Sequence, residues 1–292
     1  MNRDPQARAA ELSCWPGPVE PEPVSGGITN SNFLVESEGR RHFVRIGNDI
    51  PLHGIMRFNE LAASRAAHAA GISPEVLHHE EGAIVLRFID GRTLEPEDVG
   101  KPETLSQIIR LIKLCHREIP KHFRGPALVF WVFQVVRDYA HTLQSVGSRF
   151  RSELPRFLEA AEVLEAAVGS ISVVFGHNDL LASNFIDDGE RLWLVDWDYG
   201  GFNSPLFDLG GLASNNELSV SQEEEVLETY FEGPMSAELR LHYAAMKCAS
   251  LLRESMWSMV SEHHSTLDYD YESYTELNLA RFEATWADFE EV

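Results

Sequence analysis

Residues 177–184 read His177-Asn-Asp-Leu-Leu-Ala-Ser-Asn184, and the next apolar run ends in Val195-Asp-Trp-Asp-Tyr199. The first segment places Asp179 and Asn184 on one short loop, and the second places Asp196 at the end of a strand. Phosphoryl transfer from a nucleotide requires a carboxylate that orients the accepting hydroxyl, oxygen ligands for Mg²⁺ and groups that hold the phosphates. Asp179 is suited to the first role. Asn184 and Asp196 are suited to the second, because Mg²⁺ prefers oxygen ligands.

Three segments extend this pattern: Gly176-His-Asn-Asp, Val195-Asp-Trp-Asp-Tyr-Gly and Phe207-Asp-Leu-Gly. Together they resemble the choline/ethanolamine kinase family, which belongs to a wider group of small-molecule kinases that includes the aminoglycoside phosphotransferases. The resemblance extends from about Gly26 to about Phe282. It implies a two-lobed, protein-kinase-like α+β fold, with a small N-terminal β-sheet lobe that carries one helix and a larger, mainly helical C-terminal lobe.

Length and composition are those of a globular protein. The chain has 292 residues, of which 44% are hydrophobic, enough for two lobes with their own cores. It has no apolar run long enough to predict a membrane span, and its N-terminus lacks the basic and apolar regions of a signal peptide. The three cysteines lie far apart without a CxxC motif, so we expect free thiols in a reducing, cytoplasmic setting.

The formal net charge is −22. This charge argues against nucleic acid as a partner, because binding to phosphates requires Lys and Arg. An acidic cleft would instead concentrate a cationic second substrate. The alternative interpretation is that the acidity serves solubility alone.

The sequence predicts an N-terminal lobe over residues 1–90 and a C-terminal lobe over residues 91–292. The first lobe should hold a hairpin, one helix and two further strands, over residues 32–37, 41–46, 55–70, 74–79 and 83–88. In the second lobe, Pro120 should end the first helix. Ser221 and Glu224 match a capping box for a helix over residues 222–232. Further helices are expected over residues 128–146, 154–168, 237–262 and 272–289.

The segment Gly26-Gly-Ile-Thr-Asn-Ser-Asn32 precedes the predicted hairpin. Glycines let backbone N–H groups approach phosphates closely, and Asn and Ser side chains add donors. The segment is not a Walker A motif. The resemblance implies that it is the family's phosphate loop, with Gly27, Asn30, Ser31 and Asn32 in contact with the nucleotide.

Arg45 lies in the second predicted strand and Glu60 in the following helix. In kinase-like folds a basic residue on a strand contacts the α- and β-phosphates and is held by a glutamate on a helix. Protein kinases use Lys here, but Arg also binds phosphate and stays charged. The alternative is a surface ion pair. The resemblance further places adenine against the backbone of Arg87 and Ile89, between the lobes.

The acidic residues and the histidine of these motifs are expected to have different roles. Asp179 is the expected general base or hydroxyl-orienting group. Asp198 matches an additional acidic position of the family, where it either holds a second Mg²⁺ or is structural. His177 should support the loop by hydrogen bonding, and Asp208 should brace the loop backbone.

An ammonium group is best held by aromatic faces together with an acid. The resemblance places four aromatic residues around the acceptor's cationic group: Tyr199, Trp257, Tyr269 and Tyr274. Two positions depart from the family's animal members, which carry Trp at the position of Glu254 and Glu at that of Asn215. These departures keep ethanolamine or another amine open as the acceptor.

We therefore expect an enzyme that uses ATP and Mg²⁺ to phosphorylate the hydroxyl of a small cationic alcohol, with choline as the first expectation. Ethanolamine, thiamine or an aminoglycoside are alternative acceptors. A non-catalytic nucleotide-binding scaffold is the alternative from another class. The set of Asp179, Asn184 and Asp196 argues against it, because a binding module needs no base. The sequence does not reveal the oligomeric state.

Overall fold

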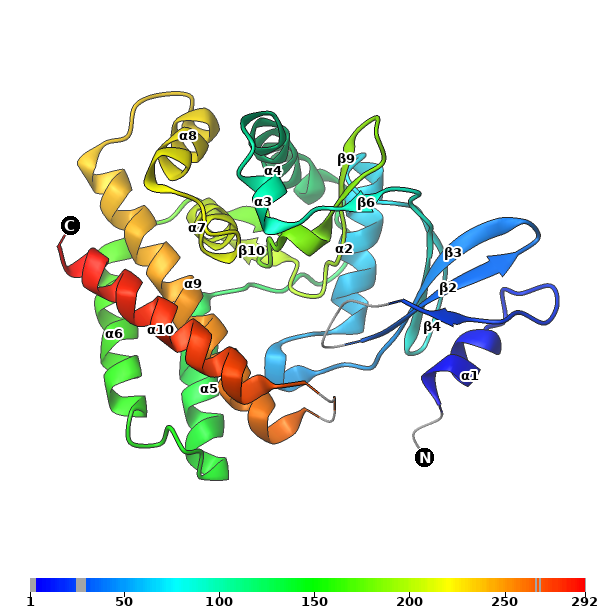
Figure 1. Cartoon of the computed structure of the whole chain (residues 1–292), viewed down its shortest axis with the longest axis horizontal. Helices are drawn as coiled ribbons and strands as arrows, with labels where there is room; N and C mark the ends of the chain where they lie inside the picture. The colour runs from blue at the N-terminus through cyan, green and yellow to red at the C-terminus, as the bar shows by residue number, and fades with distance from the viewer. Residues whose placement is uncertain (1–3, 25–29, 266, 268, 292) are drawn as a thin grey trace.

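The structure is a computed structural model that describes residues 4–24, 30–265, 267 and 269–291. An antiparallel sheet and a short helix, α1 (Pro5–Ala10), lie at one end, and a mainly helical part that includes the last helix lies at the other (Figure 1). The predicted α+β fold, with a β-sheet part and a larger helical part, is confirmed.

The N-terminal sheet has the order β1-β2-β3-β5-β4. Its strands are β1 (Glu22–Pro23), β2 (Ser31–Ser37), β3 (Arg40–Ile46), β4 (Val76–Glu80) and β5 (Ala83–Arg87). One face packs against α1 through Val35, Val44 and Val85. Because neighbouring side chains alternate between faces, Arg45 points to the opposite face. There it meets α2 (Arg57–Ala69).

Helix α9 lies at the centre of the helical part and packs against four other helices. The helices of this part are α3 (Pro96–Val99), α4 (Pro102–His122), α5 (Val132–Val146), α6 (Leu154–Val168), α7 (Pro205–Asn215), α8 (Val220–Phe231), α9 (Ala237–His264) and α10 (Tyr271–Glu290). The cores of these helices and α2 are continuous, which ties α2 to the helical part.

Three details correct the sequence predictions. Helix α4 continues through Pro120 to His122, because this proline lies in the last turn, where little helix remains to be disrupted. The capping box of α8 is formed by Ser219 and Gln222, two residues earlier than predicted. Helix α7 was not predicted. Its Gly210 allows close packing, since a Cβ there would lie 2.9 Å from the backbone of Lys247 on α9.

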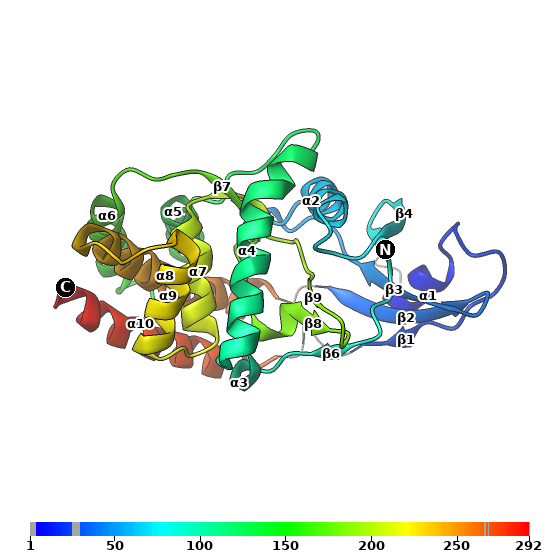
Figure 2. The same cartoon turned by 90° about the horizontal axis from the view of Figure 1, so that it is seen from above.

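Two small sheets position the loop that carries the sequence motif (Figure 2). Strands β7 (Val174–Gly176) and β10 (Gly201–Asn203) form one, and β6 (Arg92–Thr93), β8 (Phe185–Asp187) and β9 (Leu192–Leu194) form the other. The loop leaves β7, forms a short 3₁₀ turn and enters β8. The segment after β9 returns to β10. The motif residues on both segments are thus held between paired strands.

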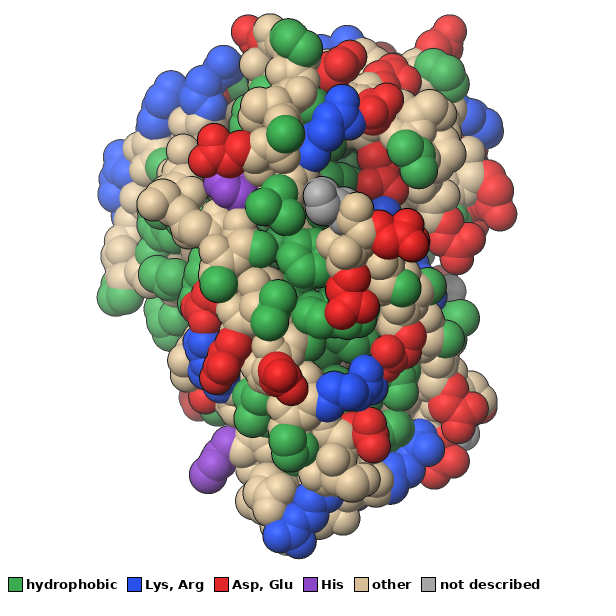
Figure 3. Space-filling model, turned by 90° about the vertical axis from the view of Figure 1, so that its left-hand side faces the viewer, with side chains coloured by type: hydrophobic (Ala, Val, Ile, Leu, Met, Phe, Trp, Pro, Cys, Tyr) green, Lys and Arg blue, Asp and Glu red, His purple; other side chains and the backbone are tan. Residues whose placement is uncertain are grey.

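The surface of the helical end carries both charge types. On the face shown in Figure 3, acidic and basic side chains are scattered around a central group of hydrophobic ones. Within the described ranges, no helix combines the length and the apolar character needed to cross a membrane.

Candidate active site

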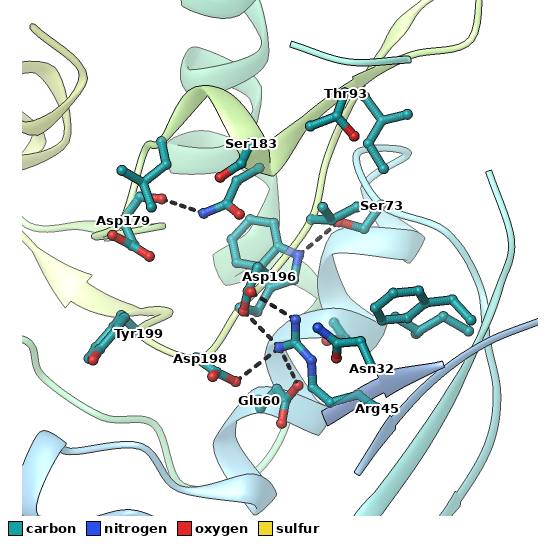
Figure 4. A pocket seen from close by; sticks show the side chains of 18 of the residues that line it. Asn32, Arg45, Glu60, Ser73, Thr93, Asp179, Ser183, Asp196, Asp198 and Tyr199 are labelled. Atoms are coloured by element: carbon teal, nitrogen blue, oxygen red, sulfur yellow. Dashed lines mark hydrogen bonds and ion pairs between the residues drawn. The ribbon is translucent and has the colours of Figure 1, made fainter. Parts of the chain in front are cut away.

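A cleft of about 530 Å³ lies between the N-terminal sheet and the helical part. One part of it, which we call the arginine end, is lined by Asn32, Arg45, Glu60, Asn184, Asp196 and Asp198. The other part, the aromatic end, is lined by Asp179, Tyr199, Glu254, Trp257, Tyr269 and Tyr274. Figure 4 shows Asp179 and Tyr199 apart from the cluster around Arg45. Residues far apart in sequence thus face one space.

The catalytic-loop segment is held by buried hydrogen bonds. Asp208 on α7 accepts the backbone N–H groups of His177 at 2.9 Å and Asn178 at 2.7 Å. The His116 ring nitrogen Nε2 lies 2.8 Å from Asp208 Oδ2. The His177 ring nitrogen Nε2 lies 2.9 Å from the Val195 carbonyl oxygen, which joins the loop to the Asp-Trp-Asp segment. The predicted supporting roles of His177 and Asp208 are confirmed.

Asp179 follows this braced segment, and its side chain lines the cleft. Burial raises the pKa of Asp179 to about 8; Arg253 opposes this shift, whereas Glu254 adds to it. Asn184 Nδ2 donates to the Asp179 backbone oxygen at 2.8 Å, so the two predicted catalytic-loop residues are fixed relative to each other. A carboxyl group with a raised pKa in a cleft is suited to proton exchange with a bound hydroxyl near neutral pH.

At the arginine end, Arg45 connects the N-terminal sheet to the Asp196–Asp198 segment that follows β9 (Figure 4). Its two Nη atoms donate to Asp196 Oδ1 and Oδ2 at 2.7 and 2.8 Å, a bidentate pair. Its Nη1 also lies 3.0 Å from Glu60 Oε1 and 3.1 Å from Asp198 Oδ1. The predicted Arg45–Glu60 ion pair is therefore present. Burial disfavours ionised Asp196, but the Arg45 charge outweighs it and lowers the pKa of Asp196.

Asp198 is held on several sides. Arg57 Nη1 donates to Asp198 Oδ1 at 2.8 Å, and Asn30 Nδ2 donates to Asp198 Oδ2 at 2.8 Å. Arg57 Nη2 closes the set by donating to Asn30 Oδ1 at 2.7 Å. The Asp198 side chain is only 5% exposed. We call Asn30, Arg57 and Asp198 the bracket, since they connect the residue before β2, helix α2 and the segment that follows β9.

The residues predicted to contact the nucleotide are distributed as follows. Gly27 lies outside the described residues. Asn32, Arg45, Glu60, Arg87 and Ile89 line the cleft, whereas Asn30 and Ser31 are absent from the described residues that line it. The Arg87 backbone N–H already donates to the Glu75 carbonyl oxygen at 2.9 Å. The predicted adenine contact of this pair therefore rests on Ile89 and on the Arg87 carbonyl.

Three of the four predicted aromatic residues form a cluster. The rings of Trp257 and Tyr274 are 6.3 Å apart at 84°, and those of Tyr269 and Tyr274 are 5.9 Å apart at 73°. The ring of His53 lies 5.4 Å from the Trp257 ring, with its Nδ1 3.0 Å from the Tyr139 hydroxyl. The buried His53 side chain thus packs against Trp257.

Tyr199 is placed differently. The guanidinium of Arg253 lies over its ring, 4.4 Å from the centroid. One face of this ring is therefore already covered by a cation. We expect Trp257, Tyr269 and Tyr274, rather than Tyr199, to form the aromatic wall for a ligand.

Sequence reasoning missed the roles of Arg57 and Arg253. Arg57 forms an i,i+3 ion pair with Glu60, and this spacing on a predicted helix was the one local signal. The contacts of Arg253 with Tyr199 join distant segments. No local pattern indicates them.

The oxygen donors at the arginine end suit a hard divalent cation. Asn184 uses its Nδ2 for the Asp179 backbone, which leaves Oδ1 as the atom for a ligand. Val195 N–H donates to the Asn184 carbonyl oxygen at 3.0 Å, so the segments that carry Asn184 and Asp196 lie side by side. Amide and carboxylate oxygens are typical Mg²⁺ ligands. Asn184 and Asp196 therefore fit the predicted metal-binding role. Both carboxylates already accept from arginines, but the Asp196 side chain is 24% exposed, whereas that of Asp198 is 5% exposed within the bracket.

Comparisons with known proteins agree with this geometry. A sequence model described as choline/ethanolamine kinase matches residues 22–230. The chain is 28% identical to Protein LicA of Haemophilus influenzae, over 91% of this chain and 79% of that protein. It is also 28% identical to a probable ethanolamine kinase of Arabidopsis thaliana, over 87% of this chain and 76% of that protein.

A solved structure shares the fold. It is the crystal structure of a choline/ethanolamine kinase family protein from Mesorhizobium loti, with a TM-score of 0.78 and 28% identity. The similarity covers 96% of this chain and 92% of that one. The likeness therefore includes both the sheet and the helical part that enclose the cleft.

Proposed function

Because the chain belongs to the choline/ethanolamine kinase family, an ATP-dependent phosphotransferase family, we propose that it transfers the γ-phosphoryl group of ATP to the hydroxyl of a small cationic amino alcohol. The observation that carries the proposal is one cleft lined together by Asp179, an aromatic cluster and the Arg45–Glu60 pair. A scaffold that only binds nucleotide would need neither Asp179 nor an aromatic end.

Different residues of the cleft would bind the phosphates, the metal ion and the ammonium group. The arginine end would hold the phosphates through Arg45, which Glu60 keeps in place. Asn184 and Asp196 would hold Mg²⁺, which supplies charge neutralisation of the phosphate oxygens when bound. Trp257, Tyr269 and Tyr274 would hold the ammonium group by cation–π contact. This arrangement leaves the acceptor hydroxyl near Asp179.

In the transfer, the bond between the γ-phosphorus and the β–γ bridging oxygen breaks, and a bond from the γ-phosphorus to the acceptor oxygen forms. Asp179 orients the hydroxyl and takes its proton, and ADP leaves. The raised pKa of Asp179 suits this role, because a base titrating near neutral pH can both accept and release a proton. An approaching cation favours the ionised carboxylate.

The test is a coupled ADP-release assay with MgATP and a panel of choline, ethanolamine, thiamine and an aminoglycoside. We expect ADP release that depends on choline or ethanolamine and exceeds the rate with thiamine or the aminoglycoside. Nucleotide binding without acceptor-dependent ADP release across the panel would support the scaffold and refute the proposal. Preference for thiamine or the aminoglycoside would reassign the acceptor class.

A further inference from the structure

Glu254 places a carboxylate inside the aromatic end of the cleft. It lies on α9, three residues before Trp257, and lines the cleft together with Trp257 and Tyr274. Its side chain is 17% exposed, so part of the carboxylate remains open to a ligand. The aromatic end thus contains a carboxylate among the residues that line it.

Both oxygens of this carboxylate are fixed. Arg253 Nη1 donates to Glu254 Oε2 at 2.7 Å, and the Tyr274 hydroxyl donates to Glu254 Oε1 at 2.9 Å. A carboxylate with two donors on different oxygens cannot rotate without breaking one of the two hydrogen bonds. Glu254 is therefore pre-oriented before a ligand arrives, which reduces the ordering cost of binding.

Arg253 lines the cleft as well and supports Glu254. It is 4% exposed, and its guanidinium lies 4.4 Å from the Tyr199 ring centroid and 5.5 Å from that of Phe130. Within the described residues its Nε and Nη2 atoms have no hydrogen-bond partner and are sealed from solvent. Arg253 Nη1 is bonded to Glu254, so at this end of the cleft a ligand meets the carboxyl groups of Glu254 and Asp179.

A fixed carboxylate distinguishes one ammonium from another. An ionised carboxylate accepts about four hydrogen bonds, and Arg253 and Tyr274 supply two of them. A primary ammonium carries three N–H donors and can supply another, whereas a quaternary ammonium carries none. A quaternary group would cover the carboxylate without replacing the water hydrogen bonds that it displaces, and burial of an unsatisfied acceptor is costly.

Building on the proposed function, we propose that Glu254, held by Arg253 and Tyr274, is the specificity-determining residue of the aromatic end. It selects acceptors whose ammonium retains N–H groups, such as ethanolamine and its mono- and dimethyl derivatives, over quaternary choline. This proposal reverses the order expected from the sequence, where choline came first. A hydrogen bond to a charged group predicts a preference on the order of 10- to 100-fold in kcat/KM.

The test measures kcat/KM for ethanolamine, N-methylethanolamine, N,N-dimethylethanolamine and choline at saturating MgATP. In the wild type we expect the value to fall with methylation, with the largest step at choline, which loses the last N–H. In Glu254→Gln the kcat/KM values for ethanolamine and choline should differ by no more than about threefold. The change should come mainly from a lower kcat/KM for ethanolamine. Tyr274→Phe, which frees one oxygen of Glu254, should lower the ratio by a smaller factor.

Glu262→Gln is the matched control, because Glu262 also lies on α9, pairs with an arginine (Arg149) and is not among the described residues that line the cleft. It should leave the ratio unchanged. A wild-type preference for choline, or an equal ratio in wild type and Glu254→Gln, would overturn the role of Glu254 while leaving the kinase function intact. Absence of ADP release with all four acceptors would overturn both. The wild-type series decides the matter even if a variant fails to fold.

Discussion

Both ends of the cleft contain carboxyl groups and arginines, but the carboxyl groups differ in how they are paired. At the arginine end, three carboxylates (Glu60, Asp196 and Asp198) share the guanidinium groups of Arg45 and Arg57. At the aromatic end, Arg253 contacts Glu254. Asp179 has no side-chain hydrogen bond to another described residue, and burial raises its pKa to about 8.

The difference follows from what each end has to bind. A site for anionic phosphates and a metal needs fixed charges of both signs, and buried charges persist only when they are paired. A site for a cation can leave a carboxyl group short of partners, because the ligand supplies the missing charge. We therefore interpret the arginine end as pre-assembled and the aromatic end as completed by its ligand.

The largest expected effect concerns Asp179, whose side chain forms no hydrogen bond with another described residue. Asp179→Asn should lower turnover by roughly 10²–10⁴-fold, the usual contribution of a positioned proton acceptor. Nucleotide affinity should stay close to that of the wild type, since the change leaves the ion pairs of the arginine end in place. Steady-state rates and nucleotide titrations of the same preparation check both statements. Near-normal turnover would remove Asp179 from the mechanism.

Asp198→Ala should mainly affect folding. It removes the acceptor shared by Asn30, Arg45 and Arg57, and breaking a buried ion pair costs about 3–5 kcal/mol of unfolding free energy. Urea titration measures this loss.

Asp196→Ala is the comparison variant, because it removes a predicted Mg²⁺ ligand. It should abolish the Mg²⁺ dependence of ATP binding, whereas folded Asp198→Ala should keep this dependence. If Asp198→Ala instead loses the metal dependence without loss of stability, Asp198 is a second metal ligand and the bracket is not structural.

Trp257→Leu should raise the KM for the acceptor by at least about tenfold, since a desolvated cation–π contact contributes about 2 kcal/mol. Leu is chosen because its apolar side chain can still pack against His53. The KM for ATP should barely change, because the nucleotide contacts lie at the other end. A variant with lower thermal stability and unchanged KM values would make Trp257 a core residue only.

A smaller effect concerns pH. An ordinary Asp is ionised throughout the neutral range, but the pKa of Asp179 is raised to about 8, so its active, ionised form increases as pH rises through this value. The profile of kcat/KM should therefore have an acidic limb near pH 8. Glu254→Gln should move this limb to lower pH, because the charge of Glu254 contributes to the raised pKa. A flat profile from pH 6 to pH 9 would contradict the assignment.

The sequence predicted what is local. Asp179 and Asn184 lie on one short loop, so their spacing alone brought them together. The likeness to kinase-like folds predicted that Arg45 on a strand pairs with Glu60 on the following helix. The bracket could not be predicted, because Arg57 and Asp198 are 141 residues apart in sequence. The same holds for Arg253, whose contact with Tyr199 depends on how α9 packs. The predicted capping box of α8 lay two residues too late in the sequence, because several Ser, Glu and Gln residues there have the same spacing.

The claim that the aromatic end is completed by a positive charge has one direct test. Choline and 3,3-dimethylbutan-1-ol have the same shape and the same hydroxyl, and they differ in the charge of the central atom. With the wild-type protein and saturating MgATP, we expect kcat/KM to be at least about tenfold lower for the neutral alcohol, from the loss of cation–π and carboxylate contacts. Equal values for the two alcohols would contradict the account, since the cleft would then recognise shape and not charge.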